Sequence, residues 1–281
     1  MLNRLRIVIR GAGDLATGVA LRLWRSGFRR MVLLERGAPL AVRRMVSLSE
    51  AVRLGSHVVE GVEARRADSP AQALDILASG AVPVLVDPVG ESLSALRPDV
   101  LVDAVMAKRN VGGTRITHAP LVVALGPGFT AGLDCHRVVE THRGHGLGRV
   151  IREGAALPDT GVPDAVMGYT VERVLRAPAD GIFETSLEVG CAVREGQAVG
   201  AVAGKPVVAP FAGVLRGLLP SLSPVAAGLK LGDVDPRNDA SACPFASDKA
   251  LAVGGGVLEA ILERFNAGPD AFRPEEGPPW P

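Results

Sequence analysis

The glycine-rich turn in the stretch IVIRGAGDLATG, residues 7–18, has the residue types needed to hold a phosphate group. Gly11 allows a tight turn after an apolar run, and Gly13 lets the backbone approach a pyrophosphate closely. Ala16 is small enough for the following helix to pack on the strand. Backbone amides at the start of that helix, aided by the helix dipole, would then bind the anion. The spacing therefore predicts a nucleotide or dinucleotide site.

Further residues in or near this turn bear on the prediction. Glu35 ends the run MVLLE, 22 residues after Gly13, where a carboxylate accepts hydrogen bonds from ribose hydroxyls. Asp14 and Thr17 join the candidate cofactor-binding residues, although Asp14 would repel an anion unless it points away or binds a cation. Arg36 could instead pair with a 2′-phosphate. The alternative is a tight strand-to-helix turn that binds nothing.

Two later segments also place polar groups or glycines directly after apolar runs. These segments are VLVDAVMAKRN, residues 100–110, and LVVALGPGFTAG, residues 121–132. A second glycine loop of this kind can hold an anion through its backbone amides. For an isolated acid, the alternative is a helix cap or a surface carboxylate. The candidates are Asp103 and Lys108 as catalytic residues, and Asn110, Gly126, Gly128 and Thr130 as cofactor-binding residues.

The elements that must position these residues form an alternating pattern over residues 1–152. Helical patterns cover Asp14–Ser26 and Ser69–Ser79, the second with Ser69 as cap and Pro70 at its first position. This alternation predicts a parallel α/β sheet of Rossmann-like type, in which the strands' carboxyl ends meet at one edge. The short apolar runs that predict strands are Leu5–Ile9, Met31–Leu34, Val82–Val86, Val100–Val102 and Leu121–Leu125.

The second half of the chain contains an internal repeat. Residues 153–170 are rich in Gly, Pro and Asp and indicate a linker. Residues 177–202 then match residues 209–234 at a shift of 32, which predicts a small all-β barrel or sandwich domain over 171–236. A C-terminal segment, 237–281, follows. Its three glycines at 254–256 are expected to break a helix, leaving a closing helix over 257–265 and a loose tail.

Composition excludes several classes of function. The 281 residues are 47% hydrophobic and 22% charged with a net charge of +1, typical of a globular chain with no basic excess for nucleic acid. No apolar run is long enough to span a bilayer, and the first residues lack the pattern of a signal peptide. Three widely spaced cysteines do not predict disulfides, so we expect a reducing, cytoplasmic location. Glycines around His142 and His145 argue against a metal site there, and none is expected.

Several long motifs together resemble one family. The motifs lie at residues 11–23, 99–110, 125–134, 138–150, 173–183, 228–237 and 247–262. They resemble the accessory proteins of selenium-dependent molybdenum hydroxylase systems, the YqeB type, from about residue 5 to residue 265. The repeat also resembles the barrel-sandwich fold of biotinyl and lipoyl carriers, with Lys205 in the connection between the copies. Without the acidic residue expected before it, Lys205 is interpreted as a surface lysine in a turn.

The resemblance implies a role in maturing a molybdenum hydroxylase, by handling or delivering its cofactor or that cofactor's selenium or sulfur ligand. It places Cys243 in a characteristic segment, which makes Cys243 a third candidate catalytic residue. The expected ligand is NAD(P) or a molybdopterin dinucleotide, and the expected protein partner is the client hydroxylase. The alternatives are an NAD(P)-dependent oxidoreductase and a non-catalytic scaffold. The sequence leaves open the ligand's identity, any catalysis and a homo-oligomeric state.

Overall fold

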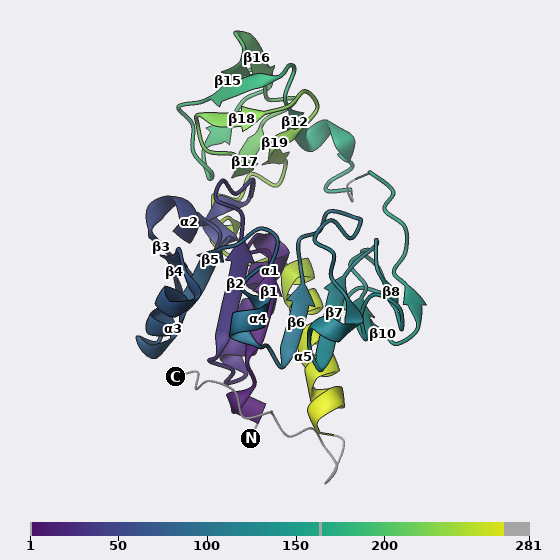
Figure 1. The fold of residues 1–281 in the computed structure, drawn as a ribbon. Helices are drawn as coiled ribbons and strands as arrows, with labels where there is room; N and C mark the ends of the chain where they lie inside the picture. Colours follow the sequence, from purple (N-terminus) through teal and green to yellow (C-terminus); the bar gives the residue numbers. More distant parts are fainter. Residues whose placement is uncertain (1, 163–164, 267–281) are drawn as a thin grey trace. The chain divides into compact units, whose positions relative to one another are not determined.

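The computed structural model describes residues 2–162 and 165–266 and divides the chain into two compact units (Figure 1). Unit 1 contains the chain up to Pro39, Ser47–Asp159 and the chain from Ala246 onward. Unit 2 contains Leu40–Val46 and Thr160–Phe245. The C-terminal helix therefore belongs to unit 1, although unit 2 separates it in sequence from the rest of that unit. The predicted loose tail lies outside the described residues from position 267 onward.

Unit 1 is built on a nine-stranded sheet with the order β10-β9-β7-β6-β1-β2-β5-β4-β3. All neighbouring strands from β9 to β4 run parallel, whereas β10 and β3 pair antiparallel at the two edges. A separate antiparallel pair joins β8 and β11. The bounds are β1 Ile7–Arg10, β2 Met31–Glu35, β3 Ser56–Val59, β4 Val62–Ala67, β5 Val82–Val86, β6 Val100–Asp103, β7 Leu121–Leu125, β8 Thr130–Ala131, β9 Arg137–Val139, β10 Val150–Ile151 and β11 Gly154–Ala155.

The five predicted strands are confirmed as β1, β2, β5, β6 and β7, so the mixed α/β class is correct. Sequence reasoning missed the other strands of unit 1, which are β3, β4, β8, β9, β10 and β11. Strand β4 shows why, because its exposed residues Arg65 and Arg66 interrupt the apolar pattern between buried Ala64 and Ala67. Its core contact comes from small side chains, which a search for bulky apolar runs does not detect.

The helices are α1 Asp14–Arg25, α2 Glu50–Leu54, α3 Pro70–Ala78, α4 Leu93–Leu96 and α5 Asp248–Phe265, with short 3₁₀ turns η1 Leu2–Arg4, η2 Arg44–Val46, η3 Ile116–His118, η4 Val171–Arg173 and η5 Ala240–Ala242. The predicted start of α3 is confirmed, since the Ser69 hydroxyl accepts a hydrogen bond from the Gln72 amide at 3.2 Å. Over residues 2–162 and 165–266, no helix is both long and apolar enough to cross a membrane.

Helices cover both faces of this sheet. Val8 of β1 lies in one buried cluster with Ile76 of α3 and Leu96 of α4. Successive strand residues point to opposite faces, so Ile7 and Ile9 point to the other face, where α1 packs along α5 (Figure 1). The carboxyl end of β1 is thereby held between two packed layers.

The prediction that glycines 254–256 break the C-terminal helix is wrong, because α5 is continuous from Asp248 to Phe265. A side chain at Gly254 would place its Cβ 2.6 Å from the carbonyl oxygen of Gly18 on α1. A side chain at Gly256 would meet the carbonyl of Gly148. These glycines therefore let α5 approach its neighbours closely, and the packing outweighs their low helix propensity.

Unit 2 consists of two four-stranded antiparallel sheets, with orders β12-β19-β17-β14 and β16-β15-β13-β18. Their bounds are β12 Val174–Arg176, β13 Gly181–Glu184, β14 Ala192–Val193, β15 Ala198–Val202, β16 Lys205–Val208, β17 Gly213–Leu218, β18 Ser223–Val225 and β19 Lys230–Asp235. The repeat shift of 32 residues places β13 on β17 and β15 on β19. It also places β12 on β16, so the repeat begins before residue 177.

The two copies interlock. One sheet combines β12 and β14 of the first copy with β17 and β19 of the second, and the other sheet combines the remaining strands. Both copies contribute to one buried core, which includes Phe183, Val202, Leu215 and Val234. Because neither sheet is complete with one copy alone, the repeat must fold as a single unit.

Candidate functional site

The carboxyl ends of the parallel strands form the edge where the candidate residues lie. From β1 the chain continues to β2 on one side, and later strands β6 and β7 lie on the other side. In open α/β sheets, ligands bind in the crevice outside the strands at such a reversal. The loops at this edge cover residues 11–13 after β1, 104–115 after β6 and 126–129 after β7.

The first glycine turn is tight at Gly11 and open at Gly13. Gly11 has φ +93°, and a Cβ there would lie 2.9 Å from the carbonyl oxygen of Ala104, in the loop after β6. Gly13 is the N-cap of α1, and no atom lies within 4 Å of where its Cβ would be. Gly11 is therefore required for packing, whereas Gly13 leaves open space in front of the start of α1.

The structure brings Glu35 to this glycine turn. Its Oε2 accepts a hydrogen bond from the Ala12 amide at 2.9 Å, and its Oε1 accepts one from the Arg36 amide at 2.8 Å. A carboxylate at the end of β2 thus lies directly against the turn after β1. This is the place from which it can accept ribose hydroxyls in a bound nucleotide.

Two of the predicted cofactor-binding residues are instead engaged inside the protein. Thr17 is fully buried, and its hydroxyl donates to the Ala12 carbonyl at 3.3 Å and accepts from the Leu48 amide at 2.9 Å. Ala16 is also buried, in the first turn of α1. Both residues therefore fix the turn and its helix, while Asp14 is half-buried at the first position of α1.

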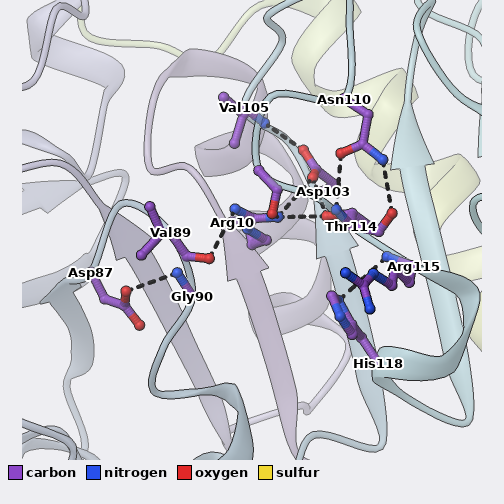
Figure 2. A network of polar contacts seen from close by, with 11 residues as sticks. Arg10, Asp87, Val89, Gly90, Asp103, Val105, Asn110, Thr114, Arg115 and His118 are labelled. Carbon is purple, nitrogen blue, oxygen red and sulfur yellow. Dashed lines mark hydrogen bonds and ion pairs between the residues drawn. The ribbon is translucent and has the colours of Figure 1, made fainter.

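A buried arginine organises the loops beside the turn (Figure 2). Arg10 is the last residue of β1 and is only 2% exposed. Its Nη1 donates to Thr114 Oγ1 at 2.6 Å and to the Gly112 carbonyl at 2.9 Å, and lies 3.5 Å from Asp103 Oδ2. Thr114 Oγ1 in turn donates to the same Asp103 oxygen at 2.6 Å. Asp103 is therefore a positioning group for this network, held by a cation and a hydroxyl.

Asn110 closes the loop that reaches Arg10. Its Nδ2 donates to the Thr114 carbonyl at 2.8 Å, and its Oδ1 accepts from the Thr114 amide at 2.9 Å. Figure 2 shows both bonds on the same side of the network as Asp103. Two predicted site residues are thus brought together, but both of these hydrogen bonds of the Asn110 side chain go to its own loop.

Lys108 lies on a strained part of the loop after β6. Lys108 and Met106 have φ values of +60° and +61°, a conformation that non-glycine residues rarely adopt and that is concentrated at functional sites. The Lys108 side chain is half exposed, and its ammonium pairs with Asp159 at 2.6 Å. Asp159 lies in the predicted linker, so no sequence signal connected it to this site.

The second glycine turn serves packing between loops. A Cβ on Gly128 would lie 2.5 Å from the Arg109 amide nitrogen, and one on Gly126 would lie 2.5 Å from Thr141 Oγ1. The amide of Thr130 donates to Asp134 at 2.8 Å. These contacts account for both glycines and for the Thr130 amide without an anion.

Sequence reasoning did not single out Arg10 or His118. The sequence did contain a signal for Arg10, because a charged residue there ends an apolar strand just before a glycine turn. His118 Nδ1 accepts from the Arg115 amide at 3.3 Å. Burial, together with the charges of Arg115 and Arg10, lowers the pKa of His118, so the ring is neutral at neutral pH.

Asp87 directly follows β5 at the same edge and organises the loop that carries Val89. Its carboxylate accepts three backbone amides and the Ser92 hydroxyl, at 2.6–3.1 Å. Burial alone would raise the pKa of Asp87, but the bonds from Ser92, Gly90 and Glu91 outweigh it and lower the pKa. The Val89 carbonyl then lies 3.4 Å from Arg10 Nη2, which ties this loop to the network.

Comparison with known proteins identifies a relative. The chain is 48% identical over 267 residues, 95% of its length, to the uncharacterized protein YqeB of Escherichia coli K12. The chain is related to YqeB. It spans about half the length of YqeB, since the match covers 49% of that protein. This relationship supports the YqeB-type resemblance of the sequence motifs, and YqeB itself carries no described activity. No family model matches the chain.

Two solved structures show a distant likeness to this chain. An aspartoacylase family protein from Mesorhizobium loti is 11% identical, with 81% of this chain and 83% of that chain covered and a TM-score of 0.27. A succinylglutamate desuccinylase/aspartoacylase from Rhodobacter sphaeroides is 15% identical, with 84% and 87% covered and a TM-score of 0.27. At these scores the likeness bears on neither fold nor activity.

The three candidate catalytic residues do not come from one unit. Asp103 and Lys108 belong to unit 1, and Cys243 belongs to unit 2. Cys243 is 2% exposed, and burial raises the pKa of its thiol, which makes it a poor nucleophile at neutral pH. Among residues 2–162 and 165–266, no three His, Cys, Asp or Glu side chains gather as a metal site.

Proposed function

We propose that unit 1 binds the phosphates of a nucleotide or dinucleotide at the turn between β1 and α1. The observation that carries the proposal is the open space at Gly13, at the N-terminus of a twelve-residue helix, with the Glu35 carboxylate on the same turn. The first amides of a helix have no partner within it and attract anions. The order β5-β2-β1-β6-β7-β9 matches the strand order of a dinucleotide-binding sheet, which supports a Rossmann-like assignment.

Each residue of the turn has a distinct part in this proposal. The backbone at Gly13 approaches the phosphates, and Glu35 accepts hydrogen bonds from a ribose. Lys108 lies in the same loop as Ala104, which packs on Gly11. In this proposal the Lys108 ammonium leaves Asp159 and pairs with a phosphate oxygen instead. Exchange of one exposed ion pair for another costs little, because exposed pairs contribute only about 0–1 kcal/mol.

We further propose that the chain acts in maturing a molybdenum hydroxylase, with the nucleotide end of a molybdopterin dinucleotide as its ligand. The support is the resemblance of its motifs to YqeB-type accessory proteins and the relationship to YqeB over 95% of the chain. An NAD(P)-dependent oxidoreductase uses the same glycine turn and a carboxylate placed like Glu35. The two candidates therefore differ in which dinucleotide binds.

The test is calorimetric titration of the full chain with ATP, GTP, CTP, NAD(H), NADP(H) and a molybdopterin dinucleotide. Gly13→Val adds a side chain into space that only a ligand would use, and Gly255→Val, also at an open position without positive φ, is the matched control. We expect the control to bind like the parent chain and Gly13→Val to bind at least tenfold more weakly, with unchanged circular dichroism. No binding of any ligand, or equal binding by Gly13→Val, would overturn the proposal.

A client-binding scaffold makes a different prediction. In that case the chain co-purifies with a molybdenum hydroxylase to the same extent in the Gly13→Val variant, while no nucleotide binds the parent chain.

A further inference from the structure

Unit 2 contains a cluster of basic side chains that the nucleotide proposal does not use. We call it the arginine cluster; its members are Arg43, Arg173, Arg216, Lys230 and Arg237, with the carboxylates Asp233 and Asp235 between them. Asp233 and Asp235 lie on β19 on either side of Val234, whose side chain is in the core of unit 2. Both carboxylates therefore lie on the face of the sheet that points away from this core.

The backbone directs Arg216 toward these carboxylates. Strand β17 pairs with β19 through Leu215 opposite Val234 and Gly217 opposite Asp233, with a register shift between them at Arg216. A bulge of this kind re-aims one side chain and is frequent beside active sites. Gly217 supports the arrangement, because a Cβ there would lie 2.6 Å from Asp233 Oδ1.

Positive charge exceeds negative charge in the cluster. Arg237 binds Asp235 through two short contacts of 2.5 and 2.9 Å. The others are longer: Arg173 and Lys230 each lie 3.6 Å from Asp233, and Arg216 lies 3.9 Å from Asp235. Arg43 acts on Arg216 through its charge, and Asp239 interacts in the same way with Arg237 and Asp235, so five cations stand against three carboxylates.

Several donors of this cluster are buried without a hydrogen-bond acceptor in the described structure. They are Nε and Nη1 of Arg173 and Nε of Arg216, on side chains that are 12% and 17% exposed. One acceptor of the cluster, Asp233 Oδ1, is likewise buried without a hydrogen-bond donor. Burial, and next the charge of Arg43, lowers the pKa of Arg216, so its own surroundings disfavour the cation. Among the described residues, Arg173 Nε has no acceptor, and Arg173 Nη1 and Arg216 Nε have only their long contacts to Asp233 and Asp235. Weakly partnered guanidinium N–H groups beside excess positive charge can bind an oxyanion.

We propose that the arginine cluster of unit 2 binds a phosphate group, with Arg173 and Arg216 donating to its oxygens. A phosphate group carries up to two negative charges, so it matches the surplus of cations better than a single carboxylate does. Lys230 and Arg237 are 40% and 50% exposed, so the cluster opens to solvent on their side. The rest of an organic phosphate can extend through this opening.

All residues of the arginine cluster belong to unit 2, and the glycine turn belongs to unit 1. A phosphate could bind at either place, so the experiment is carried out in the Gly13→Val background. Inorganic phosphate and glycerol phosphate are titrated into the full chain by calorimetry, with acetate and chloride at equal ionic strength as comparisons. If the Gly13→Val substitution by itself abolishes phosphate binding, the proposal for the arginine cluster is refuted, whereas the proposal for the nucleotide site is not.

Three variants complete the test. Arg216→Gln and Arg173→Gln should each raise the dissociation constant for both phosphates at least tenfold, whereas Arg194→Gln, an exposed arginine of the same unit, should leave it unchanged. Circular dichroism verifies that each variant is folded; should Arg216→Gln fail to fold, Arg173→Gln in the η4 turn decides. Equal binding by acetate, or unchanged phosphate binding in the folded variants, would overturn the proposal. Tighter binding of glycerol phosphate than of inorganic phosphate would assign an ester as ligand.

Discussion

The three adjacent glycines of α5 offer a direct measurement of how closely this helix is packed. Gly254 faces the backbone of α1, where a Cβ would lie 2.6 Å from the Gly18 carbonyl oxygen, while the Cβ position of Gly255 is open. Replacing either glycine with alanine gains about 1 kcal/mol of helix propensity. Only at Gly254 must the helices also move apart, and such overpacking costs about 1–3 kcal/mol.

The difference between the two variants cancels the propensity gain and isolates the contact. We expect Gly255→Ala to raise the free energy of unfolding by about 1 kcal/mol, and Gly254→Ala to fall about 1–3 kcal/mol below Gly255→Ala. Urea denaturation followed by circular dichroism measures both values. Equal stability of Gly254→Ala and Gly255→Ala would show that α1 and α5 are not in close backbone contact, and the account of this helix pair would be wrong.

Three further predictions concern buried charge and pH. Arg10→Met should lower the free energy of unfolding by about 3–5 kcal/mol, because it leaves the buried Asp103 carboxylate without its cation. Adding Asp103→Asn should recover part of this loss. If the two substitutions change the free energy of unfolding in a strictly additive way in urea melts, the prediction is contradicted. Burial raises the pKa of Asp87, but hydrogen bonds led by those of Ser92 lower it overall. The contribution of Asp87 to the free energy of unfolding is therefore complete above the unfolded-state pKa and is lost as pH falls through the folded-state pKa. Asp87→Asn should therefore lose less stability than the parent chain in thermal melts from about pH 4 down to pH 2. Burial raises the pKa of Cys243. Iodoacetamide should therefore alkylate Cys243 more slowly than a free thiol at pH 7.5, and the rate should increase steeply above about pH 9. Peptide mass spectrometry measures this rate, and rapid modification at neutral pH would refute the prediction.

Local patterns in the sequence predicted a large part of unit 1. The runs Val82–Val86 and Leu121–Leu125 are strands with the predicted bounds, and Ser69 caps α3 as its sequence indicates. These features depend on neighbouring residues only, through apolar runs, a capping hydroxyl and a proline at the first helical position. The same local reasoning failed at Gly254–Gly256, where a packing partner far along the chain reverses the expected effect.

The candidate site shows the same division. A local motif identified Gly11, Gly13 and Glu35, and the structure places the Glu35 carboxylate against the turn. The hydroxyl of Thr17 is in the same motif, but Leu48, 31 residues away, determines that it is used internally. Only the fold could show this, because a motif specifies residue types and spacing but not which distant backbone groups occupy them.

The sequence by itself determined five strands of unit 1, the start of α3, the two copies of the repeat and the glycine turn, since each follows from spacing within the sequence. Tertiary structure alone decided that Arg10 meets Asp103, 93 residues away, and that a bulge turns Arg216 toward Asp233 and Asp235. It also decided that α5 returns to unit 1. The physical reason is that buried charges and close backbone contacts depend on pairs of groups brought together by folding, and no local pattern contains both members of such a pair.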